Sequence, residues 1–435
     1  MFTGNKQENL TKKILLTLLI LIGIRLGNQI PTYGVNNLFF SSLMQGNASL
    51  SFLNSITGNS LKQLSIFALS ITPYITASII IQLLTIAIPA LEELSKDGKD
   101  GHDKIEKITY ITAGVLGYVE ALCMAIGFGK QGMLLSYTWY NCLIVGFTWG
   151  TFALVSVLLG KLIDKKGIGN GISLILFCNI ISSLPTDLYV LYTRFLTNNP
   201  IYLIIINVLL IILFILAIFT LALILNNAEK RIHIQYSGKF SGRQSHGGGS
   251  NFIPIKLMIM GVMPVIFASS IISLPGIIGA FVKTKDTGIF NTILNYLNMN
   301  NWFNIDKPLY SIGYIVYALL VIFFGYFYTS IAFNTSEVAN NLKKNGGTIN
   351  GIRPGHPTIE YLNKQLKYLV FIGTAGLLVL ATIPMVISGI FSLGNLSFGG
   401  TTIIIAVSVI FETKKKLELE NASNFAIKKM SIFHK

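Results

Sequence analysis

Long runs without charge are the feature that most restricts how this 435-residue chain can fold. Residues 63–91 and residues 368–411 contain no Asp, Glu, Lys or Arg. A helix needs roughly 20 mostly apolar residues to cross a bilayer. Only 12% of the residues are charged, about half the share of a soluble domain. The sequence therefore predicts an all-α polytopic membrane protein.

Ten apolar runs reach the length of a membrane span. They lie near residues 14–30, 65–88, 108–128, 139–160, 170–186, 200–225, 257–280, 309–333, 368–388 and 397–411. Between the first two, residues 50–59 are too short and too polar to cross. Such a piece is tolerated in a membrane only where protein or water covers its backbone, so we expect it to be half-inserted.

The basic residues predict the orientation of the spans. If the N-terminus is cytoplasmic, 26 of the 33 Lys and Arg residues lie in cytoplasmic segments and 6 in the opposite loops. Arg25 lies within the first span. Cytoplasmic loops of membrane proteins carry an excess of Lys and Arg. We therefore expect both termini to be cytoplasmic.

Two of the cytoplasmic loops, residues 226–256 and 334–367, are longer than an ordinary connection and basic. In the second loop, Gly and Pro residues at 351–357 predict a defined turn with Arg353 at its tip. A cation on a stiff projection suits docking to an acidic protein surface or to RNA phosphates. The alternative is that these charges only fix the topology and contact anionic lipid headgroups.

The residue chemistry predicts no enzyme activity, no cofactor and no metal site. No G-x-x-x-x-G-K-[ST] motif occurs, so ATP hydrolysis by this chain is not expected, and no H-E-x-x-H pair occurs. Cys123, Cys142 and Cys178 have no metal-ligand spacing. Apart from Arg25 and Glu120, the spans hold few ionisable groups that could couple transport to an ion. The pattern predicts a passive path that is driven by a separate motor.

Several long motifs resemble one family. They are IRLGNQIPTYGVN at 24–36, SIFALSITPYITASIIIQLL at 65–84, GIGNGISLILF at 167–177, NAEKRIHIQY at 227–236, GVMPVIFASSIISLP at 261–275, FNTSEVANNLKKNGGTINGIRPGHPTIEYL at 333–362 and FGGTTIII at 398–405. In this order, they resemble the SecY family, the channel-forming subunits of the bacterial protein translocase. The resemblance covers nearly the whole chain.

The resemblance implies a fold of ten transmembrane helices in two inverted, pseudo-symmetric halves of five helices around a central pore. The N-terminal half would comprise residues 1–186, with a plug at about 50–59. The C-terminal half would comprise residues 187–411 with the two long basic loops, followed by a cytoplasmic tail at 412–435.

The family has an apolar ring at the waist of the pore and a plug that blocks the pore at rest. Carried over motif by motif, the ring residues would be Ile71, Ile75, Ile172, Leu176, Ile266 and Ile405. The plug side chains would be Leu50, Phe52, Leu53 and Ile56. Helical spacing supports part of the ring, because residues 71 and 75, like 172 and 176, are four apart and share a face.

The family also has a lateral gate between the second and seventh spans, through which segments leave toward lipid. The corresponding residues here would be Thr76, Ser78, Gln82, Met258, Ser269 and Ser270. Met258 departs from the polar Asn of many relatives, which predicts a polar contact across the gate that is either weaker or arranged differently. The residues that would dock partners on the cytoplasmic side are Arg353, Lys343, Lys344, Lys239 and Arg243. Near the tip of the second loop, Asn350 stands where relatives usually have Pro.

The function implied is a protein-conducting channel in the bacterial cytoplasmic membrane, for secretory preproteins and nascent membrane proteins. The implied partners are SecE-like and SecG-like subunits, the SecA ATPase, the ribosome and membrane lipid. Two alternatives remain open at this point. One is an accessory channel for dedicated clients, and the other is a small-solute secondary transporter with helices broken at Pro73 and Pro264.

Overall fold

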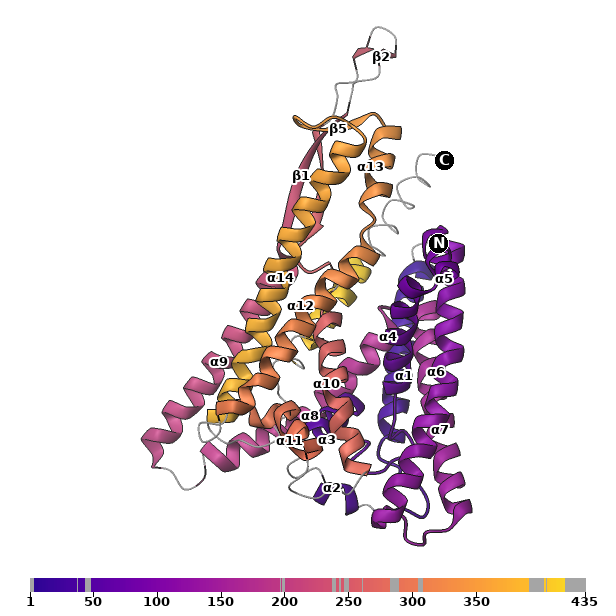
Figure 1. Cartoon of the computed structure of the whole chain (residues 1–435), viewed down its shortest axis with the longest axis vertical. Coiled ribbons are helices and arrows are strands. Elements are labelled where there is room, and N and C mark those ends of the chain that lie inside the picture. The colour runs from indigo at the N-terminus through magenta and orange to yellow at the C-terminus, as the bar shows by residue number, and fades with distance from the viewer. Residues whose placement is uncertain are drawn as a thin grey trace.

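The chain is predominantly helical, as the sequence predicts (Figure 1). The structure, a computed structural model, describes residues 4–36, 38–43, 48–195, 197, 200–236, 240–241, 244–245, 250–259, 261–281, 289–303, 308–390, 403 and 405–418. Every structural statement below concerns those residues.

The first part of the chain forms helices of which α1, α4, α5, α6 and α7 lie side by side on one side of the molecule, whereas α2, α3 and α8 lie closer to its middle (Figure 1). Its elements are α1 (Gly4–Gly27), α2 (Phe39–Leu43), α3 (Ala48–Thr57), α4 (Thr72–Ala87), α5 (Pro89–Lys96), α6 (Gly98–Phe128), η1 (Gly129–Met133), α7 (Trp139–Lys166) and α8 (Gly171–Phe195). Glycines let α7 approach α6, because a Cβ at Gly146 or Gly150 would overlap Leu122 or Tyr118 of α6.

The second part of the chain forms a further group of helices beside the first (Figure 1). These are α9 (Ile201–Asn227), α10 (Met263–Phe281), α11 (Ile289–Leu297), η2 (Met299–Asn301), η3 (Pro308–Ser311), α12 (Ile312–Ala332), α13 (Thr335–Lys344) and α14 (His356–Ile390). Residues 405–418 are also helical. A Cβ at Gly325 of α12 would overlap Thr374 of α14, so small residues bring helices together here too.

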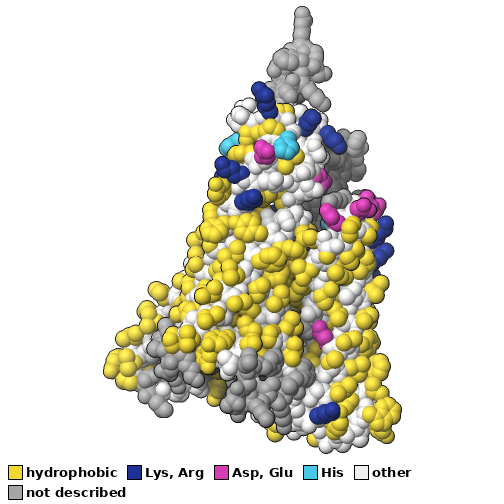
Figure 2. All heavy atoms as spheres, viewed as in Figure 1, with side chains coloured by type: hydrophobic (Ala, Val, Ile, Leu, Met, Phe, Trp, Pro, Cys, Tyr) yellow, Lys and Arg dark blue, Asp and Glu magenta, His cyan; other side chains and the backbone are white. Residues whose placement is uncertain are grey.

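Within the described residues, seven helices are long and apolar enough to cross a membrane. The count becomes eight when α4 and α5, which meet at a bend of 105°, are taken as one broken span. Apolar side chains cover the surface of the helical region, whereas Lys, Arg, Asp and Glu gather mainly at one end of the molecule (Figure 2). The arrangement is that of a polytopic membrane protein with a charged projection.

The predicted span at 65–88 is wrong at its N-terminal end, because α4 begins only at Thr72. The preceding residues form turns, and Ser70 adopts a φ of 47°. Pro73 lies in the first turn of α4. A proline is well tolerated there, since the first N–H groups of a helix have no partner within the helix. Pro73 therefore starts the helix and does not break a longer one.

The span predicted at 257–280 likewise begins later, because α10 starts at Met263 with Pro264 in its first turn. Residue 260 is outside the described part of the chain, and residues 257–259 are not helical. The interpretation of Pro73 and Pro264 as breaks within membrane helices, on which the solute-transporter alternative relied, is therefore wrong.

The two long basic loops are joined by a β-sheet, which the sequence analysis did not predict. Strand β1 (Glu229–Tyr236) pairs antiparallel with β4 (Ser250–Lys256) on one side and with β5 (Gly347–Ile349) on the other. Two short strands, β2 (Phe240–Ser241) and β3 (Gln244–Ser245), pair beyond β1. Within the described residues, both loops therefore contribute strands to one sheet.

A small apolar core holds the sheet against α14. Ile232 of β1, Ile255 of β4 and Ile349 of β5 are buried together with Leu362 and Leu366 of α14. The strands place Ile232 and Ile234 on the same face because side chains alternate along a strand. The basic loops thus form one folded unit, at the end of the molecule where charged side chains gather (Figures 1 and 2).

Candidate pore and docking surfaces

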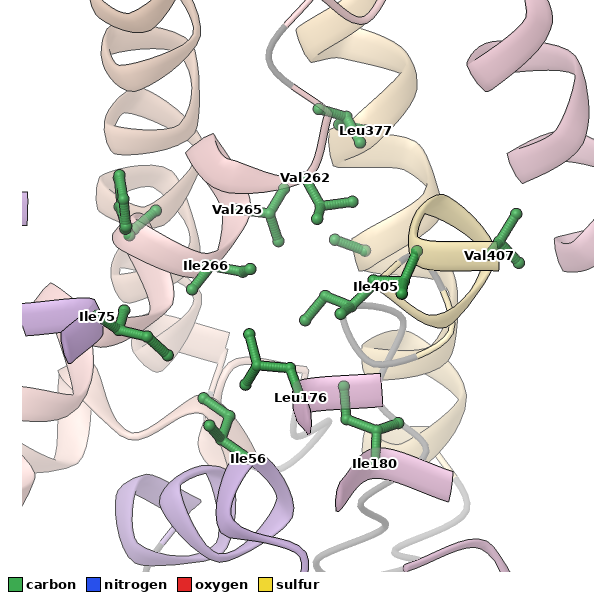
Figure 3. Packing of buried hydrophobic residues seen from close by; sticks show 14 of the residues in the cluster. Ile56, Ile75, Leu176, Ile180, Val262, Val265, Ile266, Leu377, Ile405 and Val407 are labelled. Atoms are coloured by element: carbon green, nitrogen blue, oxygen red, sulfur yellow. The ribbon is translucent and has the colours of Figure 1, made fainter. Parts of the chain in front are cut away.

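Four of the predicted ring residues come from four separate helices and converge (Figure 3). Ile75 belongs to α4, Leu176 to α8 and Ile266 to α10, and Ile405 belongs to the helical residues 405–418. All four are buried in one apolar cluster. Segments that are more than 300 residues apart in the sequence therefore meet in one cluster, each through a residue near the start of its helix (Figure 3).

The other two predicted ring residues belong to the same cluster but are placed differently. Ile71 directly precedes α4 and is fully buried. Ile172 lies in the first turn of α8 and is only partly buried, packed against the edge of the cluster. A Cβ at Gly160 of α7 would lie 3.1 Å from the Ile172 side chain, so part of that side chain faces α7.

The structure adds residues to this constriction that the sequence analysis missed. Ile180 of α8, Val262 directly before α10, and Val265 lie among the predicted ring residues (Figure 3). Helical spacing offered a signal for two of them, because Ile180 follows Leu176 by four residues and Val262 precedes Ile266 by four. The labelled side chains in this view are all aliphatic. A constriction of this composition offers no ligands that could replace the hydration shell of an ion.

Helix α3, formed by the segment predicted as a plug, lies against the constriction. Ile56 is buried in the same cluster as the ring residues, near Leu176 and Ile75 (Figure 3). Phe52 packs against that cluster too. Leu50, which is fully buried, and Leu53 belong with a second apolar cluster inside the N-terminal bundle. The segment therefore has two apolar sides, one toward the constriction and one toward the bundle.

The polar residues predicted for the lateral gate are bonded within their own helices or to α6. Thr76 donates to Glu120 Oε1 of α6 at 3.0 Å and to Thr72 O at 2.8 Å. Gln82 donates to Ser78 Oγ within α4 at 3.0 Å. On α10, Ser270 donates to Ile266 O at 2.8 Å.

The remaining two gate residues are buried. Ser269 is fully buried on α10, and Met258 lies in the apolar cluster of the constriction. Met258 is thus packed as an apolar side chain, and the altered polar contact across the gate stays a prediction. Ile75 and Ile266 place α4 and α10 on neighbouring sides of the constriction (Figure 3).

The docking residues within the described part of the chain are exposed on the charged projection. Arg353 is exposed in the turn before α14, and Lys343 and Lys344 are exposed at the end of α13. Lys239 and Arg243 lie outside the described residues. The turn at Arg353 has Gly351 at a φ of 77° and Gly355 at a φ of 108°. These values confirm the predicted turn, because residues other than glycine rarely adopt them.

Several helices contribute aliphatic side chains to one buried cluster, and the short helix α3 packs against it, which is the arrangement that the resemblance predicts for a membrane channel. The comparisons with known proteins agree with this class. The family model described as SecY matches residues 65–414. The chain belongs to the SecY family.

Curated relatives match over nearly their whole length. The chain is 37% identical to the protein translocase subunit SecY of Bacillus subtilis over 424 residues, which cover 94% of each chain. It is 35% identical to the corresponding subunit of Corynebacterium glutamicum over 431 residues, covering 95% of each. The SecY family is a family of translocation channels and not of enzymes.

Solved structures share the fold. One, described as a protein-conducting channel, matches with a TM-score of 0.65 at 20% identity and covers 94% of this chain and 92% of its own. Sec61 in the canine ribosome–channel complex matches with a TM-score of 0.63 at 18% identity, with the same coverage. The fold class predicted from the sequence is confirmed, and the structure adds a three-stranded sheet to it.

Proposed function

We propose that the chain forms the protein-conducting channel of a Sec translocase in the bacterial cytoplasmic membrane. It passes unfolded secretory polypeptides across the membrane and releases transmembrane segments sideways into lipid. The observation that supports this best is the convergence of Ile75, Leu176, Ile266 and Ile405 beside α3 (Figure 3). Family membership and the near-complete coverage of translocase subunits add to it.

The aliphatic constriction acts as the seal and α3 acts as the plug. A narrow apolar ring tends to lose its water and cannot solvate ions, so it resists leakage. Its side chains have no fixed polar ligands and therefore do not select among the sequences that pass. Flexible aliphatic groups close around a moving polypeptide of any composition. Ile56 extends the apolar contact from the ring to the plug.

Lateral release takes place between α4 and α10. A segment that reaches the constriction partitions between the pore and lipid according to its own composition. A charge at the centre of a segment costs about 2.5 to 3.5 kcal/mol in the membrane, whereas Leu, Ile and Phe favour it. Gln82 on α4 and Ser270 on α10 make hydrogen bonds within their own helices. Few hydrogen bonds between α4 and α10 therefore have to break when the two helices separate.

The charged projection docks the motor on the cytoplasmic side, and both termini are cytoplasmic. The exposed cations Arg353, Lys343 and Lys344 suit an acidic protein surface or ribosomal RNA phosphates. The motor is the SecA ATPase or a translating ribosome, and the channel assembles with SecE-like and SecG-like subunits. The canine relative, a ribosome–channel complex, is consistent with such docking.

Depletion of the chain from living cells tests this function. We expect many secreted proteins to accumulate together as uncleaved precursors, and newly made membrane proteins to fail to insert. Accumulation of only a few precursors would indicate the accessory channel with dedicated clients. Normal secretion combined with loss of saturable uptake of a small solute would contradict the proposal and favour a transporter.

A further inference from the structure

The carboxyl end of α3 is held by polar groups that the apolar seal does not explain. The last carbonyl groups of any helix have no partner within that helix. Here the carbonyls of Ile56 and Gly58 accept hydrogen bonds from side chains of two other helices, α1 and α8. The contacts lie beside the constriction, since Ile56 is itself part of the apolar cluster.

Asn179 of α8 is the central donor. It is fully buried, and its amide donates to Ile56 O at 3.1 Å and to Ser70 Oγ at 3.0 Å. Ser182, one turn further along α8, has a single hydroxyl hydrogen, which Asn179 O at 2.6 Å and Gly58 O at 3.3 Å share as acceptors. A buried amide without partners is costly, so the placement of Asn179 among acceptors is specific.

Arg25 of α1 provides the third contact. Its guanidinium donates from Nη1 to Gly58 O at 3.1 Å. Asn28, which is 1% exposed, lies between Arg25 and Asn179. With its amide turned one way it donates to Asn179 Oδ1 at 3.4 Å, and turned the other way it accepts from Arg25 Nη1 at 3.0 Å. A charge within a membrane span is expensive, and these oxygens compensate it.

Gly58 shows that the fit is close. Its φ is +67°, and an added Cβ would lie 2.6 Å from Arg25 Nη1 and 2.8 Å from Asn179 Cα. Only glycine leaves room for α1 and α8 to reach the backbone at this point. The residues around it are tied together, because Asn54 donates to Asn59 Oδ1 at 2.7 Å and accepts from Lys62 N at 2.9 Å.

We propose that Arg25, Asn179 and Ser182 are positioning residues that latch the carboxyl end of the plug in the closed channel. The proposal rests on the proposed function, in which α3 is the plug. The latch holds backbone carbonyls, so it fixes the position of the plug independently of the side chains that seal the pore. The apolar contacts exclude water and ions, and the latch sets how readily the plug leaves.

The latch can open at little cost because each donor keeps a second acceptor. When Ile56 O moves away, Asn179 still donates to Ser70 Oγ. Ser182 still donates to Asn179 O, and Asn28 still offers its oxygen to Arg25. None of the three donors is then left buried and unpaired, which is the main penalty of breaking a buried hydrogen bond. The plug is therefore held reversibly.

The test uses the full chain, assembled with its partner subunits and placed in planar lipid bilayers. Asn179→Leu and Ser182→Ala each remove donors to the plug. We expect the resting ion conductance to rise about three- to tenfold for each, in line with the loss of one or two hydrogen bonds. Gly58→Ala should raise it similarly by crowding Arg25 and Asn179. Arg25→Gln should raise conductance, and Arg25→Lys should restore most of the closure.

Ser183→Ala is the matched control for Ser182→Ala. Ser183 is also buried on α8, but its hydroxyl donates only to Ile180 O of its own helix. A second measurement follows the plug itself, using a cysteine introduced at Ile56 in a chain whose natural cysteines are replaced. Loss of the latch should raise the rate at which a water-soluble thiol reagent modifies this cysteine by about three- to tenfold, while Ser183→Ala leaves it unchanged.

Deletion of residues 50–57 separates the two proposals. If the deletion raises conductance while the Asn179 and Ser182 variants change neither conductance nor labelling, the latch is wrong and the plug stands. If the deletion leaves conductance unchanged, the assignment of α3 as the plug is wrong. A rise in both measurements for Ser183→Ala equal to that for Ser182→Ala would also overturn the latch.

Discussion

The constriction and the charged projection solve opposite problems with opposite chemistry. In the constriction, the aliphatic side chains that Figure 3 labels come from six helical segments and include no polar group. In the projection, three strands and two helices hold exposed cations at fixed positions. The first surface has to accept any polypeptide, and the second has to recognise particular partners. The comparison teaches that generality here comes from the absence of directional bonds, and specificity from a rigid backbone that presents charge.

Charge reversal at Arg353 should give the largest effect. It should impair docking at the projection and leave the constriction intact. Arg353→Glu places a carboxylate on the tip of an ordered turn, opposite an acidic partner. We expect translocation of a preprotein into vesicles to fall about a hundredfold, the order expected when a buried charge pair is disrupted. Resting ion conductance should not change. The control is Lys364→Glu, which reverses a charge at an exposed position on α14, away from the turn of Arg353. It should change translocation very little.

Opening the constriction should give the converse result. Replacing Ile71, Ile75, Ile172 and Ile266 together by Ser introduces polar groups that allow the pore to wet. We expect ion conductance to rise on the order of tenfold, with partner docking unchanged. Four serines at the exposed positions Ile111, Ile126, Ile144 and Ile315 serve as the control. Equal conductance in the two variants would mean that the seal lies elsewhere.

A smaller effect should follow from loosening the joint between the two basic loops. Ile349 of β5 is buried in the core of the sheet and pairs with Ile234 of β1. Ile349→Ala should destabilise the projection by about 2 to 5 kcal/mol and weaken motor binding several-fold, leaving conductance unchanged. Amide hydrogen exchange in β1 measures the loosening. Thr348, the middle residue of β5, is exposed, so Thr348→Ala should change the stability of the projection very little.

The smallest effect should come from the cap of α13. The side chain of Asn334 accepts hydrogen bonds from the backbone N–H groups of Ser336 and Glu337. Asn334→Ala should destabilise this helix by about 1 kcal/mol, whereas Asn334→Ser should retain most of the cap. Protection of the α13 amides against exchange reports the difference. If the alanine and serine variants behave alike, the cap does not stabilise the projection.

The sequence predicted the constriction better than the projection, for physical reasons. Membrane spans are set by local composition, so uncharged runs predict most of the helices. The ring residues came from the resemblance to a known family, and helical spacing did not place Ile71, because it precedes α4. The sheet depends on pairing between β1 and β5, which lie more than 100 residues apart, and no local pattern encodes that pairing. The start of α4 was missed because turns at 65–71 have the same apolar composition as a helix.

The polar seat of the plug was also beyond sequence reasoning. Asn179 and Ser182 look like ordinary polar residues of a membrane span, and the sequence shows Arg25 only as one of the few ionisable groups in the spans. All three side chains contact backbone carbonyl groups of the plug segment. Every residue has such a carbonyl, so the sequence does not show which one accepts. The sequence does show a glycine at position 58, but the reason for it, a positive φ and close contacts, is seen only in the folded chain.

The sheet has a mechanical consequence. Strand β1 directly follows α9, and β4 leads toward α10, with the backbone of Leu257 bonded to that of Ala228 at the base of the pair. Ile266 lies ten residues after Lys256, the last residue of β4. We expect a load applied at the turn of Arg353 to act on β5, then on β1 and β4, and to reach Ile266 through the ten residues that follow β4. We therefore expect force on the projection to be transmitted to the apolar side chains around Ile266.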